Sequence, residues 1–203
     1  MEKIGAEKRD ETTAVILCGG NSRRFGRDKA AADHHGQSLL DHVLEVCGVH
    51  ADQIILACGR ESRYASLGLT LALDAPGSDG PLAGIDAGLK AASHPSILIV
   101  AVDLAGVNPR GIEMLREAWR EDPTADLVLP RTERGVEPLL CVGRREPLRA
   151  AVATLIATSD PAPRRLPEFL KTRFIDVATG PGDPLHRALT NINTPQDLAA
   201  LDG

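Results

Sequence analysis

Positive charge and glycine gather in one short stretch of this 203-residue chain, at residues 17–29. Its glycines let backbone N–H groups approach an anion, because no Cβ stands in the way. Four basic side chains fall within seven residues of a protein whose formal net charge is −5: Arg23, Arg24, Arg27 and Lys29. These features together predict a site for a multiply charged anion such as a phosphate chain.

Two common phosphate-binding loops do not explain this stretch. A Walker A loop needs four residues between its glycines, whereas five residues separate Gly20 from Gly26. It also needs Ser or Thr after the lysine, and here Ala30 follows Lys29. The dinucleotide fingerprint G-x-G-x-x-G is absent as well. On composition alone, a solvated basic turn after a strand is as good an interpretation of residues 17–29 as an anion site.

Two aspartates stand at the ends of apolar runs. Asp103 follows residues 96–102, the most apolar run of the chain, and Asp74 follows residues 69–73. Open α/β sheets bind ligands at the carboxyl ends of their strands, so Asp103, at the end of the central strand and beside the basic loop, is where a hard-cation ligand is expected. The alternative for Asp103 is a cap or turn residue. Asp74 begins Asp-Ala-Pro-Gly, a sequence typical of a turn, so a turn role is an equal alternative to a ligand contact there.

Strand-like and helix-like segments alternate along the chain. Short apolar runs predict strands at residues 13–18, 53–57, 69–73, 96–102, 125–129, 136–142 and 174–177. Helical spacing predicts helices at residues 38–47, 79–89, 109–120, 146–158 and 167–171, with a last one capped by Thr194. Residues 159–165 are expected to be a loop. This order predicts an α/β fold, a three-layer α/β/α sandwich with a mostly parallel central sheet and residues 96–102 as its central strand.

Composition narrows the functional classes. Aromatic residues make up 2% of the chain, so we expect a core of Leu, Ile, Val and Ala. The negative net charge argues against a general nucleic-acid or membrane-surface binder. The four cysteines have no C-x-x-C spacing and are expected to be free thiols in a reducing cytoplasm. Residues 1–12 are expected to be a mobile tail before a single domain at residues 13–203.

The order of residues in the basic loop resembles the signature G-G-x-S-x-R-x-G-x-D-K of the nucleotidyltransferases related to molybdenum cofactor guanylyltransferase. The fixed positions are met by Gly19, Gly20, Ser22, Arg24, Gly26, Asp28 and Lys29. Residues 80–84 resemble the G-P-L-A-G helix start of that family, and residues 191–198 resemble its C-terminal N-x-N-T-P-x-D-L. The resemblance covers the chain from about Thr13 to its end.

The resemblance implies a Rossmann-like nucleotidyltransferase that transfers GMP from GTP to molybdopterin with Mg²⁺ and releases pyrophosphate. It implies that the backbone holds the base and phosphates at Leu17, Cys18, Gly19 and Gly20. Arg24 and Lys29 would neutralise the triphosphate, and Asp74 would contact the nucleoside. Asp103 would bind Mg²⁺.

On the acceptor side, the resemblance implies that Asn191 and Asn193 contact the pterin. It also implies contacts with other enzymes of molybdenum cofactor synthesis. The basic residues Arg131, Arg134 and Arg144 have two interpretations: they meet acceptor phosphates, or they belong to a solvated charged hairpin.

The chain departs from the family pattern at three places. Ala57 stands where guanylyltransferases often carry an asparagine, Ala105 replaces a usual proline, and Cys18 replaces an alanine. Two alternatives therefore stay open. One is a related enzyme that uses CTP or another phosphorylated acceptor, and the other is a nucleotide-binding protein without turnover.

Overall fold

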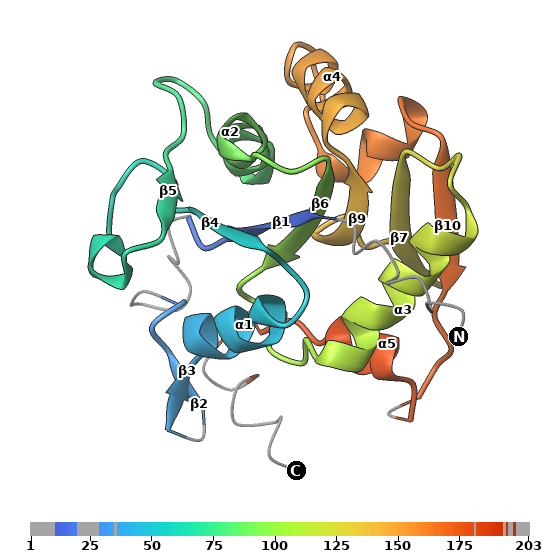
Figure 1. The fold of residues 1–203 in the computed structure, drawn as a ribbon, viewed down its shortest axis with the longest axis horizontal. Helices are drawn as coiled ribbons and strands as arrows, with labels where there is room; N and C mark the ends of the chain where they lie inside the picture. Colours follow the sequence, from blue (N-terminus) through green and yellow to red (C-terminus); the bar gives the residue numbers. More distant parts are fainter. Residues whose placement is uncertain are drawn as a thin grey trace, which may run out of the picture.

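A computed structural model describes residues 11–19, 29–34, 36–180, 182–192, 194 and 197. One eight-stranded sheet runs through it, with seven strands in the order β10-β7-β9-β6-β1-β4-β5 (Figure 1). The eighth strand, β8, pairs with β7. Its strands are β1 (Thr12–Leu17), β4 (Gln53–Ala57), β5 (Thr70–Ala72), β6 (Ser96–Ala101), β7 (Leu127–Thr132), β8 (Gly135–Val136), β9 (Leu140–Arg144) and β10 (Thr172–Asp176). A separate hairpin joins β2 (Asp33–His34) to β3 (Gln37–Ser38).

The sheet is mostly parallel, as the sequence predicted. Strand β9 runs antiparallel to both of its neighbours, β6 and β7, and β8 runs antiparallel to β7. Only two residues, 133–134, connect β7 to β8, and such a short connection makes an antiparallel hairpin rather than a parallel crossover. Strand β9 then continues along β7 in the same direction as β8. Strand β6 occupies the middle of the sheet and all six of its residues are buried, which confirms it as the central strand.

Helices cover both faces of this sheet, so the predicted three-layer arrangement is confirmed. Helices α2 (Pro81–Ala91) and α4 (Arg145–Ile156) pack together on one face, and α1 (Leu39–Gly48), α3 (Pro109–Glu121) and α5 (Pro184–Ala188) lie on the other (Figure 1). Two 3₁₀ helices, η1 (Ala65–Leu67) and η2 (Pro163–Glu168), complete the described elements.

Local chemistry explains where several helices begin. The Ser38 hydroxyl accepts a hydrogen bond from the Asp41 N–H at 3.0 Å, so the predicted N-cap of α1 is confirmed. The short helix α5 was missed, although Asp183 caps it and Pro184 occupies its first position, a recognisable start signal. Thr194 and Asp197 exchange hydrogen bonds of 2.8 and 3.2 Å, as expected of a helix cap.

The helix predicted at residues 167–171 is wrong, and so is the end of the loop predicted at residues 159–165. The chain instead forms η2, because Pro163 suits a first helical turn and Leu166 is fully buried. The predicted strand at residues 136–142 is divided between β8 and β9. Pro138 has no N–H to offer to a sheet, so the interruption falls around it.

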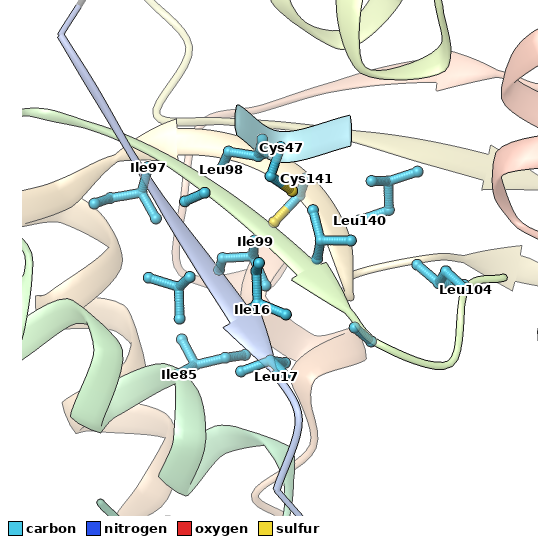
Figure 2. Packing of buried hydrophobic residues seen from close by; sticks show 14 of the residues in the cluster. Ile16, Leu17, Cys47, Ile85, Ile97, Leu98, Ile99, Leu104, Leu140 and Cys141 are labelled. Atoms are coloured by element: carbon cyan, nitrogen blue, oxygen red, sulfur yellow. The ribbon is translucent and has the colours of Figure 1, made fainter. Parts of the chain in front are cut away.

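The core consists of aliphatic side chains from both faces of the sheet (Figure 2). Ile16 and Ile99 come from neighbouring central strands, and Ile85 contributes to the core from α2. All four cysteines are free and buried, as expected. Burial raises the pKa of the Cys47 and Cys141 thiols to about 12, so both stay protonated at neutral pH. Within the described residues, no helix has the length and apolar character needed to cross a membrane.

Candidate active site

The carboxyl ends of β1 and β6 meet at the point where the strand order reverses. From β1 the chain passes to β4 on one side, and it later returns to β6 on the other side. Leu17 pairs with Ala101, and the Val102 N–H donates to the Leu17 carbonyl at 3.0 Å. Ligands of open α/β sheets bind in the crevice at such a switch point. The last residues of β1 and the first residues after β6 therefore flank the expected ligand position.

Lys29 and Asp103 meet at this crevice although 74 residues separate them in sequence. The Lys29 Nζ lies 3.3 Å from the Asp103 Oδ2, with 13% and 28% of the two side chains exposed. Solvent therefore screens this ion pair less than it screens a surface pair. The Lys29 carbonyl accepts a hydrogen bond from the Ala32 N–H, which fixes the chain in a turn before α1. The structure thus brings together the two charges that the sequence assigned to one site.

The backbone after β1 is held against the end of β4. The N–H groups of Cys18 and Gly19 both donate to the Ala57 carbonyl, at 3.0 and 2.8 Å. A Cβ on Gly19 would lie 2.3 Å from the Gly59 nitrogen, so this close approach requires glycine. These two N–H groups are engaged within the protein. The rest of the predicted anion site, including Gly20 and Arg24, falls in residues 20–28, which lie outside the described residues.

Asp74 lies just beyond the end of β5. Its N–H donates to the Gly59 carbonyl at 2.7 Å, which ties it to the loop after β4. Its Oδ1 is buried and accepts no hydrogen bond within the described part of the chain. Burial raises the pKa of this carboxyl, the Asp79 charge raises it further, and the Arg60 charge opposes both. A buried acceptor without a donor is costly, so Asp74 is suited to a hydrogen bond from a ligand.

Asn191 is brought beside Asp103 by the C-terminal segment. Asn191 forms an antiparallel bridge with Leu104, and the Ile192 N–H donates to the Asp103 carbonyl at 2.9 Å. Asp103 and Asn191 both line a cavity of about 220 Å³. The predicted acceptor residue Asn191 and the predicted metal ligand therefore share one space. Asn193 lies outside the described residues.

Glu137 also lines this cavity, and sequence reasoning missed it. It sits between β8 and β9, and nothing in its local sequence marks it as facing the end of β6. Two arginines of the same region have structural roles instead. Arg131 pairs with Asp176 at 2.7 Å, and Arg144 donates to the Ala125 carbonyl at 3.1 Å. These contacts favour the charged-hairpin interpretation for both.

A family model described as the MobA-like NTP transferase domain matches residues 14–196. The chain belongs to this family. A protein of Pseudomonas fluorescens strain SBW25 named molybdenum cofactor guanylyltransferase is 34% identical over 197 residues, with 94% of each chain covered. A protein of the same name from Pseudomonas paraeruginosa strain PA7 is 33% identical over 199 residues, with 91% of each chain covered.

One solved structure that resembles this chain is molybdopterin-guanine dinucleotide biosynthesis protein A from Archaeoglobus fulgidus. It superposes with a TM-score of 0.73 at 24% identity, and the match covers 93% of this chain and 95% of that one. This likeness shows the fold: a Rossmann-like sheet flanked by helices. The match to the MobA-like domain and the curated relatives together identify this chain as an enzyme, a nucleotidyltransferase.

Proposed function

We propose that this MobA-like transferase moves GMP from GTP to molybdopterin and releases pyrophosphate. The observation that carries the proposal is the ion pair between Lys29 and Asp103, at 3.3 Å, beside the switch point of the sheet. The pair joins a cation suited to phosphate and a carboxylate suited to a hard metal ion, and this supports the proposal. The names of the curated relatives support guanine and molybdenum cofactor as the substrates.

Asp103 fits Mg²⁺. Within the described residues no three His, Cys, Asp or Glu side chains gather into a metal cage. Mg²⁺ in nucleotide enzymes does not need such a cage, because one or two carboxylates and the substrate phosphates hold it. Bound there, Mg²⁺ would supply charge neutralisation on the triphosphate. Lys29 adds a second positive charge from the protein, and we assign the same role to Arg24.

The acceptor supplies its own nucleophile. An oxygen of its terminal phosphate forms a bond to the α-phosphorus of GTP, while the bond from that phosphorus to the bridging oxygen of the β-phosphate breaks. The electron pair leaves with pyrophosphate. The attacking phosphate is already anionic at neutral pH, so no general base is needed. Rate enhancement then comes from alignment and charge neutralisation.

Nucleotide and acceptor would occupy opposite sides of Asp103. Asp74 stands beyond β5, on the β4 side of β1, and offers its unpaired Oδ1 to the nucleoside. Asn191 stands on the other side with the cavity, and we assign the pterin contact to it and to Asn193. The four free thiols are typical of a reducing compartment, so we also propose a cytoplasmic location. Because the curated relatives are named for the molybdenum cofactor, we propose contacts with other enzymes of its synthesis.

One observation favours CTP as the second candidate nucleotide. Ala57 is 1% exposed at the end of β4, and it has no side-chain amide to select guanine. A thermal-shift panel of GTP, CTP, ATP and UTP with Mg²⁺ decides between the bases, because a ligand at 100 times its Kd stabilises the folded chain by about 2.7 kcal/mol. We expect the largest shift with GTP. A larger shift with CTP would assign the enzyme to the cytidylyl class.

A further inference from the structure

The cavity beside Asp103 is on the side of β6 away from Asp74. It lies between the β8–β9 connection, the start of η2 and the segment at Asn191. Its volume of about 220 Å³ is below the roughly 300–1,000 Å³ typical of sites for whole drug-sized ligands. It therefore suits one ring system of a substrate rather than an entire nucleotide.

The walls of this cavity combine flat apolar surfaces with a few polar groups. Leu104, Pro138 and Pro163 contribute apolar surface, against which a planar ring can pack. Glu137 and Asn191 contribute a carboxylate and an amide to the same cavity. Neither of these two side chains forms a hydrogen bond or an ion pair with another described residue. Both polar groups are consequently available to a ligand.

The position of Glu137 is fixed by its own backbone. Its N–H donates to the Pro130 carbonyl at 3.0 Å, and its carbonyl accepts from the Leu140 N–H at 3.4 Å. The side chain is half-buried. Burial raises the pKa of the Glu137 carboxyl, and the Arg134 charge opposes this shift. A carboxylate that loses water on folding without gaining a donor is destabilised until a ligand supplies N–H groups.

We propose that Glu137 selects the acceptor by accepting two N–H hydrogen bonds from the amino-pyrimidinone edge of its pterin ring. The two oxygens of a carboxylate match two adjacent N–H donors, namely the exocyclic amino group and the neighbouring ring N–H. The Asn191 amide can serve the carbonyl of the same ring. The inference rests on the proposed function, because it takes molybdopterin as the acceptor.

Binding of two related rings to the full chain tests this inference. Pterin carries the amino group, whereas lumazine has a carbonyl oxygen in its place. The affinities of both can be measured by the fluorescence of the rings, at concentrations up to millimolar. We expect the wild-type chain to bind pterin at least tenfold more tightly than lumazine, and Glu137→Gln to remove that preference. The control is Glu133→Gln, an exposed carboxylate in the same hairpin, which should keep it.

Three results of this binding assay would overturn the inference: equal affinity of the wild-type chain for both rings, no binding of either ring, or a preference retained by Glu137→Gln. A thermal shift with MgGTP separates this failure from a failure of the proposed function. The inference expects the same MgGTP shift in the wild-type chain and in Glu137→Gln. Loss of the shift in the variant alone would place Glu137 on the nucleotide and would also overturn it. Absence of the shift in the wild-type chain would count against the proposed function.

Discussion

Most of the candidate site was predicted from the types and spacing of individual residues. The spacing of glycine and basic side chains predicted an anion site, and the ends of apolar runs predicted carboxylates beside it. The pairing of Lys29 with Asp103 places these two expectations at one position. Glu137 escaped prediction because its importance depends on where a hairpin places it, which no local pattern encodes.

Lys29→Ala should lower kcat for pyrophosphate release by about 10²–10³-fold, because it removes a preorganised positive charge from the transition state. Lys29→Arg should retain part of the activity. The matched control is Lys90→Ala, which removes an exposed lysine from α2 and should leave the rate unchanged. Steady-state rates of all three variants, with circular dichroism as a check of folding, make the comparison. A rate within twofold of wild type for Lys29→Ala would refute the role of Lys29.

Asp74→Asn should stabilise the ligand-free chain at pH 7. Burial raises the pKa of Asp74, so the folded chain holds this proton more tightly than the unfolded chain does. The ionised carboxylate therefore costs stability above its folded pKa, and the cost fades as the pH falls towards the unfolded value of about 3.9. Urea unfolding at pH 7 and pH 4 should show an advantage of the variant that narrows at the lower pH.

The same substitution should weaken binding of MgGTP if Asp74 contacts the nucleoside. Glu117→Gln, which changes an exposed carboxylate on α3, should affect neither property. A variant less stable than wild type at pH 7, or an advantage that does not change with pH, would contradict the account of Asp74.

At the scale of elements, the strands and the long helices could be predicted, because apolar periodicity and caps are local signals. The antiparallel direction of β9 and the 3₁₀ helix η2 were not predicted from the sequence. The first depends on which strands β9 pairs with, and the second depends on burial of Leu166 by distant parts of the chain. The close packing of α2 on β1 is a further property of elements. A Cβ on Gly88 would lie 2.3 Å from the Val15 Cγ1.

Gly88→Ala should therefore destabilise the protein. Helix propensity alone favours alanine by about 1 kcal/mol, but overpacking against β1 costs about 1–3 kcal/mol. Adding Val15→Ala makes room for the new methyl group, so the double variant should lose less than the sum of the two single losses. Urea unfolding measures these free energies. Gly48→Ala is the control, because no heavy atom lies within 4 Å of its added Cβ. Greater stability in Gly88→Ala than in wild type would disprove the packing argument.

At the scale of the whole molecule, the order of strands determines where the substrates would meet. The switch between β1 and β6 puts Asp103 between the Asp74 side of the sheet and the cavity at Glu137. The sequence predicted an α/β sandwich but not this order, because strand order and register arise from long-range packing. Only the folded sheet therefore separates the proposed nucleotide side from the proposed acceptor side.

The central claim is nucleotidyl transfer from GTP to molybdopterin, and release of pyrophosphate tests it most directly. The purified chain would be mixed with Mg²⁺, molybdopterin and either GTP or CTP, and pyrophosphate would be measured over time. Omission of molybdopterin and the variant Asp103→Asn serve as the controls. The account predicts release with GTP that requires both molybdopterin and Asp103. Release with CTP but not with GTP, or no release with either nucleotide, would contradict it.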